Sequence, residues 1–362
     1  MEENRKYQYW MKCIPGIGNK KQKKLVEYCG SAKEVYGLTK RRLMEVDGIL
    51  ERDVCAIDES RRHFDLEKEA QILENTKISM ITIEDEAFPE RFRNIQDCPY
   101  AIFYRGKLPL ESEKTAAVVG ARLCSSYGRA AGLALGEALA RCGVSVVSGM
   151  AAGIDSFGHW GAIRGRGKTY AVLGCGPDIC YPKGGKELYR KILEKGAVLS
   201  EYPPRTNPVP GQFPARNRLI SALSDIVIVV EAKKRSGSLI TADFALDQGK
   251  DVYAVPGRLD DILSEGCNEL IRQGCGIVTS MESLLLELGF SSAKTEKEEK
   301  KIKKALEEEE LMVYSCFDLH SKSMEDLAKE TGFPAFKLAD LLVKLQVKGL
   351  IEEYFKNHYR KI

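Results

Sequence analysis

Residues 115–149 read TAAVVGARLCSSYGRAAGLALGEALARCGVSVVSG. The stretch opens with a short apolar run that ends at Gly120 and closes with a second run that ends at Gly149. Between them, small and apolar residues recur at the spacing of a helix. A helix that joins two buried strands forms a right-handed crossover between parallel strands. The stretch therefore predicts one strand–helix–strand unit of a parallel sheet.

The same alternation continues to residue 257. Further apolar runs follow at TYAVLG (169–174), AVLSEY (197–202), DIVIVVEA (225–232) and DVYAVPG (251–257), with helical patterns between them. Strands that alternate with helices predict a sheet covered on both faces. We therefore expect an α/β domain with a doubly wound, mostly parallel, Rossmann-like sheet. Ligands of such sheets bind beyond the carboxyl ends of the strands.

Composition limits the classes of protein to consider. The chain has 362 residues, 44% of them hydrophobic and 30% charged, with a formal net charge of +3. It has no run near the ~18 apolar residues of a membrane span and no N-terminal signal-peptide pattern. The 11 cysteines form no CxxC pair, and the 4 histidines add no metal-binding spacing. We expect a cytoplasmic protein with reduced thiols, no membrane insertion and no metal.

Changes in composition divide the chain. A charged stretch, SSAKTEKEEKKIKKALEEEE, separates the central part from a compact C-terminal part. We expect a helix-hairpin-helix or SAM-like domain at 1–65, a bridging segment packed on the core at 66–110, the Rossmann-like domain at 111–289, a charged linker at 290–308 and a winged-helix domain at 309–362.

The expected strand ends carry residues suited to an anion. Glycines let a backbone approach a ligand closely, and helix N-termini present free N–H groups to negative charge. Each glycine taken singly could serve only a tight turn, but several such ends together with cations favour a phosphate-binding rim. The rim comprises Arg122 after the first strand, Ser148, Gly149, Met150 and Gly153 after the second, Gly174 after the third, and Lys233, Lys234, Arg235 and Ser236 after the fifth.

This rim does not match a nucleotide-cofactor site. The first loop reads GARLCSSYG in place of GxGxxG, and the second strand lacks the acidic residue that binds a ribose. The chain also contains no GxxxxGK[ST]. These departures argue against a dinucleotide site and against a P-loop ATPase.

The segment NPVPGQFPARNRLISALSD (207–225) lies between the fourth and fifth expected strands. Its prolines predict an extended approach to a helix that begins near Arg216, Asn217 and Arg218. Cations at a helix N-terminus oppose the helix dipole, so helix stability does not account for them, whereas binding of phosphate would. Phe213 could stack on a base or pack in the core.

Residues 144–160, VSVVSGMAAGIDSFGHW, bring a serine, a carboxylate and a histidine close together, which suggests a hydrolase. However, no GxSxG elbow surrounds Ser148 or Ser156, and Asp155 stands where a helix cap is expected. His159 follows one turn later, so it can pack or pair with Asp155. We interpret the stretch as one wall of the phosphate-binding pocket.

The N-terminus resembles a helix-hairpin-helix. IPGIGNKKQKKL (14–25) has the glycine turn and the basic helix start of that motif, and a looser second copy at 44–57 is expected to be structural. The basic residues either contact DNA or form a solvated helix face; they are Lys20, Lys21, Lys23 and Lys24.

The C-terminus, residues 323–362, has the pattern of a winged helix. Its expected recognition helix, 337–348, supplies few groups that read bases, namely Lys337, Lys344, Gln346 and Lys348. Contact with DNA and contact with another protein are equally compatible with this pattern.

Taken together, the motifs VVGARLCSSYG, VVSGMAAGIDSFGHWGAI, FPARNRLISALSD and AKKRSGSLITADFALDQGKDVYAVPG resemble the signature of the DNA-processing protein A family, also called DprA or Smf. The resemblance runs from about residue 80 to about residue 285. It implies a protein without enzymatic activity that binds single-stranded DNA, protects incoming DNA and loads a RecA-type recombinase in natural transformation and homologous recombination. It also implies a homodimer that needs no cofactor.

The resemblance assigns roles to residues of this chain. It implies a DNA pocket that includes Arg122, residues 148–153, Phe213, Arg216, Asn217 and Arg218, with Lys233, Lys234, Arg235 and Ser236 beside it. It places the dimer and recombinase contacts on the helix with Asn268, Leu270, Ile271 and Gln273. Ala121 departs from the serine that many members carry, which should matter little for phosphate binding.

Two other functions remain open. Rossmann-like relatives cleave nucleoside monophosphates, and Asp155 or Glu231 could act on a bound ribose. Against this, RSGSLITADFA lacks the glutamate that a phosphoribohydrolase would place there. A sequence-specific transcription factor acting through the winged helix is the other possibility, and the sparse recognition helix counts against it.

Overall fold

The computed structural model describes residues 3–289, 306–317, 322–355 and 357–361. The chain divides into two compact units, Met1–Phe290 and Ser291–Ile362, each of which is described by itself. Most of the linker expected at 290–308 lies outside the described residues. In the described ranges no helix has the length and apolar character needed to cross a membrane.

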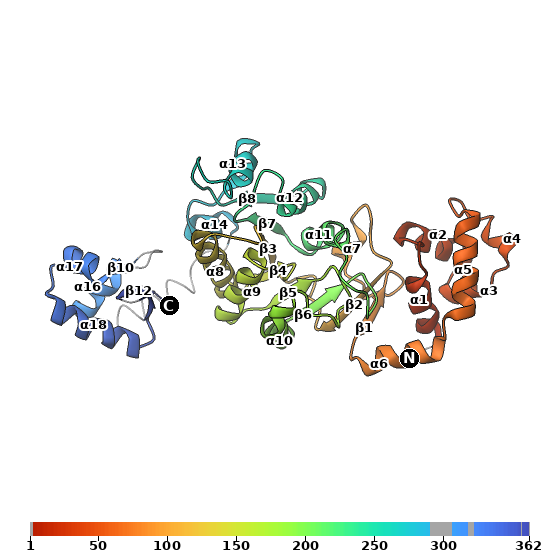
Figure 1. Cartoon of the computed structure of the whole chain (residues 1–362), viewed down its shortest axis with the longest axis horizontal. Helices are drawn as coiled ribbons and strands as arrows, with labels where there is room; N and C mark the ends of the chain where they lie inside the picture. The colour runs from red at the N-terminus through yellow and green to blue at the C-terminus, as the bar shows by residue number, and fades with distance from the viewer. Residues whose placement is uncertain (1–2, 290–305, 318–321, 356, 362) are drawn as a thin grey trace. The chain divides into compact units, whose positions relative to one another are not determined.

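Within the described residues, the first unit contains one nine-stranded sheet with the order β1-β2-β6-β5-β4-β3-β7-β8-β9 (Figure 1). Neighbours from β6 to β9 are parallel, whereas β1/β2 and β2/β6 are antiparallel. The strands are β1 (Ser79–Thr82), β2 (Ala101–Gly106), β3 (Thr115–Val119), β4 (Ser145–Ser148), β5 (Thr169–Val172), β6 (Ala197–Ser200), β7 (Ile226–Val229), β8 (Asp251–Ala254) and β9 (Gly276–Ile277). The doubly wound, mostly parallel, Rossmann-like sheet expected from the sequence is confirmed.

Strand order determines where a ligand site can form. From β3 the chain winds outward through β4, β5 and β6, and then returns to place β7 on the other side of β3. In register, Ala116 of β3 pairs with Val146 of β4 and with Ile226 of β7. The carboxyl ends of β4, β3 and β7 therefore meet at one edge, beside the point where strand order reverses. Doubly wound sheets bind their ligands there.

Helices cover both faces of the sheet, so alternate residues of a strand enter different cores. Ala116 and Val118 of β3 join the core with Leu135, whereas Ala117 and Val119 join the core with Leu219. The first layer holds α8 (Ser126–Arg141), α9 (Ile154–Arg164), α10 (Lys186–Lys195) and α14 (Met281–Glu287), with the 3-10 turn η1 (Lys183–Gly185) before α10. The second holds α7 (Glu90–Arg93), α11 (Gln212–Leu223), α12 (Gly237–Asp247) and α13 (Glu265–Arg272).

Helices α8 and α9 approach each other through glycines. A Cβ on Gly136 would lie 2.2 Å from the carbonyl oxygen of Gly158, and one on Gly161 would lie 2.2 Å from that of Leu133. Backbone atoms cannot give way as the tip of a side chain can. This contact therefore fixes α9, and with it the loop at the carboxyl end of β4.

The N-terminal module shares a hydrophobic core with the edge of the sheet. Tyr9, Trp10 and Leu25 of the module pack in one cluster with Tyr100 and Phe103. The module contains α1 (Glu3–Cys13), α2 (Asn19–Cys29), α3 (Ala32–Gly37), α4 (Lys40–Leu43), α5 (Glu51–His63) and α6 (Leu66–Asn75). The segment 66–110, expected to bridge, supplies α6, β1, α7 and β2, so part of it belongs to the sheet itself.

The second unit has the arrangement of a winged helix. Two helices meet at Gly332, whose φ of 71° suits a tight turn, and an antiparallel strand pair follows. Val313, Leu327, Leu338 and Leu342 form its core. The described elements are α16 (Glu308–Cys316), β10 (Lys322–Ser323), α17 (Met324–Thr331), α18 (Ala335–Val347), β11 (Ile351–Phe355) and β12 (His358–Lys361).

We predict that Gly136→Ala destabilises the first unit. The added methyl group would press on the Gly158 carbonyl and force α8 and α9 apart, which costs about 1–3 kcal/mol in overpacked sites. Gly132→Ala is the matched control in the same helix, because a Cβ there would meet its nearest neighbour at 3.4 Å. This control should be neutral or stabilising, since alanine favours helices over glycine. Thermal unfolding compares them, and equal melting temperatures would contradict this explanation.

Candidate nucleic-acid interface

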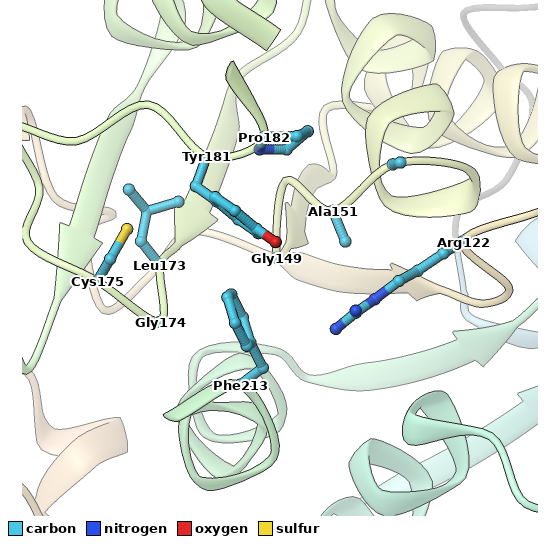
Figure 2. A pocket seen from close by; sticks show the side chains of 10 residues that line it. Arg122, Gly149, Ala151, Leu173, Gly174, Cys175, Tyr181, Pro182 and Phe213 are labelled. Carbon is cyan, nitrogen blue, oxygen red and sulfur yellow. The ribbon is translucent and has the colours of Figure 1, made fainter. Parts of the chain in front are cut away.

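A pocket lies at the carboxyl edge of the sheet (Figure 2). Its volume of about 90 Å³ is well below the ~300–1,000 Å³ of sites for whole small molecules, so it suits one group of a larger ligand. The lining comes from the loops after β3, β4 and β5, the loop before α10 and the first turn of α11: Arg122, Gly149, Ala151, Ala152, Leu173, Gly174, Cys175, Tyr181, Pro182 and Phe213. The pocket therefore lies where the winding of the sheet predicts a ligand.

Two aromatic rings and a guanidinium converge on this pocket from three different segments (Figure 2). The ring centroids of Tyr181 and Phe213 lie 5.3 Å apart, with 33° between the ring planes. The guanidinium carbon of Arg122 lies 5.4 Å from the centroid of Phe213. Tyr181 and Arg122 are exposed and Phe213 is half-buried. The group can hold a planar ring by stacking and an anion by its positive charge.

The loop that carries Arg122 is fixed by Glu231. This buried carboxylate follows β7 and accepts hydrogen bonds from the backbone N–H of Ser125 at 2.9 Å and from the Ser125 hydroxyl. A Cβ on Gly128 would lie 2.3 Å from the Glu231 carboxyl group, so glycine permits this close approach. Both oxygens of Glu231 therefore hold the first loop.

The loop after β4 is supported from inside. Ser148 is fully buried and its hydroxyl donates to the carbonyl oxygen of Val118 at 2.7 Å. The backbone N–H of Gly149 donates to Oδ2 of Asp155 at 3.1 Å. The Met150 side chain is buried. Gly153, with a φ of 82°, lets this loop touch the first one, because a Cβ there would lie 2.2 Å from the carbonyl oxygen of Ala121. Of these predicted residues Gly149 lines the pocket, and the side chains of Ser148 and Met150 face inward.

Arg216 lies beneath the pocket. One of its guanidinium nitrogens donates to the carbonyl oxygen of Gly149 at 3.0 Å and also to that of Val172, so it links the ends of β4 and β5. Burial lowers the pKa of Arg216 to about 10, which leaves it charged at neutral pH. Burial also raises the pKa of Asp155, and the charge of Arg216 opposes that rise. Arg216 and Asp155 therefore place opposite charges in the buried region under Gly149.

Two further residues of the FPARNR segment (213–218), Asn217 and Arg218, also bind other protein groups. Arg218 is buried and forms two hydrogen bonds of 2.7 Å to the carboxylate of Glu201. Asn217 donates from Nδ2 to the carbonyl oxygen of Gly237 at 3.0 Å, which ties α11 to the start of α12. Phe213 is the member of this group that lines the pocket.

The basic segment after β7 lies on the surface. Lys233, Lys234 and Arg235 are exposed, and Ser236 caps α12 by accepting a hydrogen bond from the backbone N–H of Ser238 at 3.4 Å. Because β7 is the neighbour of β3, this segment leaves the same sheet edge as Arg122. The two loops place their cations along one edge.

Of the residues predicted on α13, some bind or pack inside the protein and others reach the surface. Asn268 exchanges two hydrogen bonds with the backbone of Gly257, and Leu270 is buried in the core. Ile271 is half-buried and Gln273 is exposed. The preceding loop exposes two apolar side chains, Leu259 at 95% and Ile262 at 61%.

The N-terminal hairpin, whose lysines were expected either to contact DNA or to form a solvated helix face, contacts the edge of the sheet through Asn19. Oδ1 of Asn19 accepts a hydrogen bond from the backbone N–H of Tyr100 at 3.2 Å. Lys21 pairs with Asp53. Lys24 pairs with Asp47, whereas Lys20 is exposed and Lys23 is half-buried.

The expected recognition helix, α18, presents apolar side chains. Its exposed residues include Phe336, Val343 and Val347. The lysines of this region form ion pairs within the unit: Lys337 with Glu309, Lys344 with Asp340 and Lys348 with Glu310.

The two carboxylates that the sequence suggested for an enzyme, Asp155 and Glu231, interact with other protein groups. Asp155 is buried with Arg216, and Glu231 holds the first loop. The described ranges contain no cluster of three or more histidine, cysteine, aspartate or glutamate side chains able to hold a metal ion.

The family model of DNA recombination-mediator protein A matches residues 79–289, from β1 to just beyond α14. The chain belongs to this family. Among curated relatives, DNA processing protein DprA of Streptococcus pneumoniae is 42% identical over 229 residues, which cover 63% of this chain and 81% of that protein. Protein Smf of Synechocystis is 31% identical over 305 residues, covering 83% and 77%. The resemblance seen in the sequence motifs is confirmed.

Solved structures of family members share the fold. The X-ray structure of DprA from Streptococcus pneumoniae matches with a TM-score of 0.68 and 38% identity, covering 78% of this chain and 97% of that one. A structure of the Helicobacter pylori protein, described for its single-stranded DNA binding mode, matches with a TM-score of 0.54 and 30% identity, covering 59% and 95%.

Sequence reasoning missed Tyr181. It follows Cys180 and precedes Pro182 in a loop after the third strand, and nothing in the sequence pairs it with Phe213, 32 positions further on. The available signal was an aromatic residue in a proline-flanked loop beyond a parallel strand. Glu231 binds the loop after the neighbouring strand β3, and no pattern in the sequence around Glu231 indicates this role.

We predict a pH dependence of stability that originates at His159. The Thr169 hydroxyl donates to the carbonyl oxygen of Val146, so it accepts from Nδ1 of His159 at 2.6 Å, and Nε2 has no hydrogen-bond partner among the described residues. Burial lowers the pKa of His159 from 6.5 to about 3. Between these values the unfolded chain binds a proton that the folded chain does not. The free energy of unfolding is therefore not reduced by His159 above about pH 6.5. It falls as the pH drops below that value, by about 2 kcal/mol at pH 5.

Urea unfolding of the wild type and of His159→Gln at pH 7 and pH 5 tests this prediction. The variant should lose less stability between the two pH values, because glutamine does not titrate. Equal losses in the two proteins would show that other groups cause the dependence.

Proposed function

We propose that this chain binds single-stranded DNA along the carboxyl edge of its sheet and mediates recombination by loading a RecA-type recombinase. The observation that carries the proposal is the convergence of Arg122, Phe213 and Tyr181 at the pocket. Aromatic faces beside a cation are what single-strand binders use for bases and phosphates.

In this proposal the residues divide between contact and support. Arg122, Phe213, the backbone of Gly149 and the cations Lys233, Lys234 and Arg235 face the strand. The residues that shape the surface behind them are Ser148, Met150, Gly153, Arg216, Asn217, Arg218 and Ser236. Arg216 acts on the ligand indirectly, because its hydrogen bond to the carbonyl oxygen of Gly149 fixes the loop that faces the strand.

Single strands fit the pocket better than a duplex. A base can reach Phe213 and Tyr181 only if its face is free, and base pairing and stacking hide that face in a duplex. The pocket is also too small for more than one group at a time. A strand bound along the edge would therefore offer single bases to the pocket while its phosphates meet the exposed cations.

Loading of a recombinase and formation of a homodimer need surfaces away from the pocket. We assign them to α13, where Ile271 is half-buried and Gln273 is exposed, and to the preceding loop, which exposes Leu259 and Ile262. The description of the family as recombination mediators supports this part of the proposal. We place the activity in the cytosol, where a recombinase acts on DNA. Asp155 and Glu231 are committed to the framework, so we propose binding without cleavage.

We predict that Phe213→Leu weakens binding of labelled oligo-dT, by the ~1–3 kcal/mol that one stacked base contributes in other single-strand binders. Arg122→Ala should weaken binding and reduce the slope of log K against log salt by ~0.7, the value for one phosphate contact. Arg141→Ala, which removes an exposed arginine at the far end of α8, is the control and should change neither quantity. Fluorescence anisotropy over a salt series measures both. Equal affinity for duplex, or wild-type binding by Phe213→Leu, would refute the site.

We also predict that Gln273→Glu combined with Ile271→Glu separates loading from binding. The pair introduces two negative charges on α13 and leaves the pocket untouched, so oligo-dT affinity should stay within about twofold, a change of ~0.4 kcal/mol. Recombinase loading onto strands coated with single-strand-binding protein should be lost. Normal loading would remove α13 from the proposal, and release of free base from bound nucleotides would favour an enzyme instead.

A further inference from the structure

A buried polar network joins the N-terminal module to the helix that carries Phe213. Lys12, near the end of α1, donates from Nζ to Oδ1 of Asn19 at 2.8 Å. Nδ2 of Asn19 donates to Oε2 of Glu201 at 3.2 Å. Glu201 in turn accepts the two hydrogen bonds from Arg218 of α11. The network therefore runs from α1 and α2, through the residue after β6, to α11.

Burial makes this network sensitive to the loss of any member. The side chains of Glu201 and Arg218 are only 7% and 8% exposed. Burial alone raises the pKa of Glu201, but the bonds and charge of Arg218, together with the charge of Lys12, lower it below its usual value. A buried carboxylate is stable only while its partners stay in place. Asn19 and Lys12 are therefore part of what holds Glu201 and Arg218 in position.

A second contact restrains the chain four residues after Glu201. Arg205 forms an ion pair with Glu69 of α6. The backbone N–H of Arg205 also donates to Oδ1 of Asp178 at 2.9 Å, in the loop that leads to Tyr181. The N-terminal module thus contacts the start of segment 201–211 at two points.

Segment 201–211 is suited to pass this restraint on to α11. It reads EYPPRTNPVPG, and its four prolines fix φ and limit the conformations of the chain that leads into Phe213. The seat of Phe213 is narrow, because a Cβ on Gly174 would lie 2.9 Å from a ring carbon of Phe213. A small displacement of the first turn of α11 would therefore change the pocket.

We infer that the N-terminal module is a positioning element for the DNA site: through Asn19–Glu201–Arg218 and Glu69–Arg205 it sets the place of Phe213 in the pocket. The inference rests on the proposed function. It assigns Lys12, Asn19 and Glu69 to the site although none of them contacts the ligand.

The test combines DNA affinity with a measurement that needs no DNA. In the full chain, Asn19→Ala should weaken oligo-dT binding by about threefold to tenfold, the size expected for one buried hydrogen bond. The salt slope should not change, because no cation is removed from the site. In a Phe213→Leu background the same substitution should add less than about a twofold effect, since it acts through a ring that is no longer there. Hydrogen exchange of the amides at 216–219, which have acceptors within α11, should become faster without DNA.

Glu69→Gln gives a second, milder test, because it breaks the ion pair at the surface and leaves the charge of Arg205 in place. It should shift binding in the same direction as Asn19→Ala. Glu67→Gln is its matched control on the same helix: Glu67 pairs with Lys6, is 79% exposed and should leave binding unchanged.

The outcomes separate the inference from the proposed function. If Phe213→Leu weakens binding but Asn19→Ala and Glu69→Gln do not, the positioning role is wrong and the DNA site stands. An equal effect of Asn19→Ala in both backgrounds, or unchanged exchange at 216–219, would also overturn the positioning role. If Phe213→Leu binds like the wild type, the DNA site fails, and faster exchange in Asn19→Ala would then support only a structural coupling.

Discussion

The pocket depends on the hydrogen bonds that the buried guanidinium of Arg216 donates to the backbone. From below the sheet edge it links the carbonyl oxygen of Gly149 to that of Val172, and it balances the buried charge of Asp155. Asp155, at the start of α9, in turn accepts a hydrogen bond from the backbone N–H of Gly149. Two strand ends, a helix start and α11 therefore meet at one buried charge. Without it, Gly149 and Val172 would carry unsatisfied carbonyl groups, and the floor of the pocket would have no fixed shape.

The arginines of the site differ in burial and therefore in the groups that they bind. Arg216 and Arg218 are buried and bind protein groups, whereas Arg122 is exposed beside Phe213. A buried arginine is costly unless it is paired, and each of these has a carboxylate nearby: Asp155 for one and Glu201 for the other. The two buried arginines thus make a rigid surface, and the exposed one remains available to a ligand.

The sequence predicts the fold better than it predicts the roles of single residues. Runs such as IVIV in β7 are apolar over their whole length because both faces are covered, so strand positions and the parallel sheet can be read locally. Gly149 and Phe213, which the sequence assigned to the candidate site, both line the pocket. Whether Arg216 faces a ligand or a backbone carbonyl depends on β5, which lies more than 40 positions away in the sequence. Tyr181 and Glu231 gain their roles in the same way, from neighbours that only the folded chain supplies.

The N-terminal hairpin illustrates the same limit. Its glycine turn and basic helix start are typical of a surface that meets DNA phosphates, and local sequence can say no more than that. In the folded chain, the first residue of α2, Asn19, is used for the Tyr100 amide and the Glu201 carboxylate. The side chain at this helix start therefore binds internal partners. A motif identifies the chemistry that a backbone offers, but the packing around it decides whether the partner is a nucleic acid or another part of the same protein.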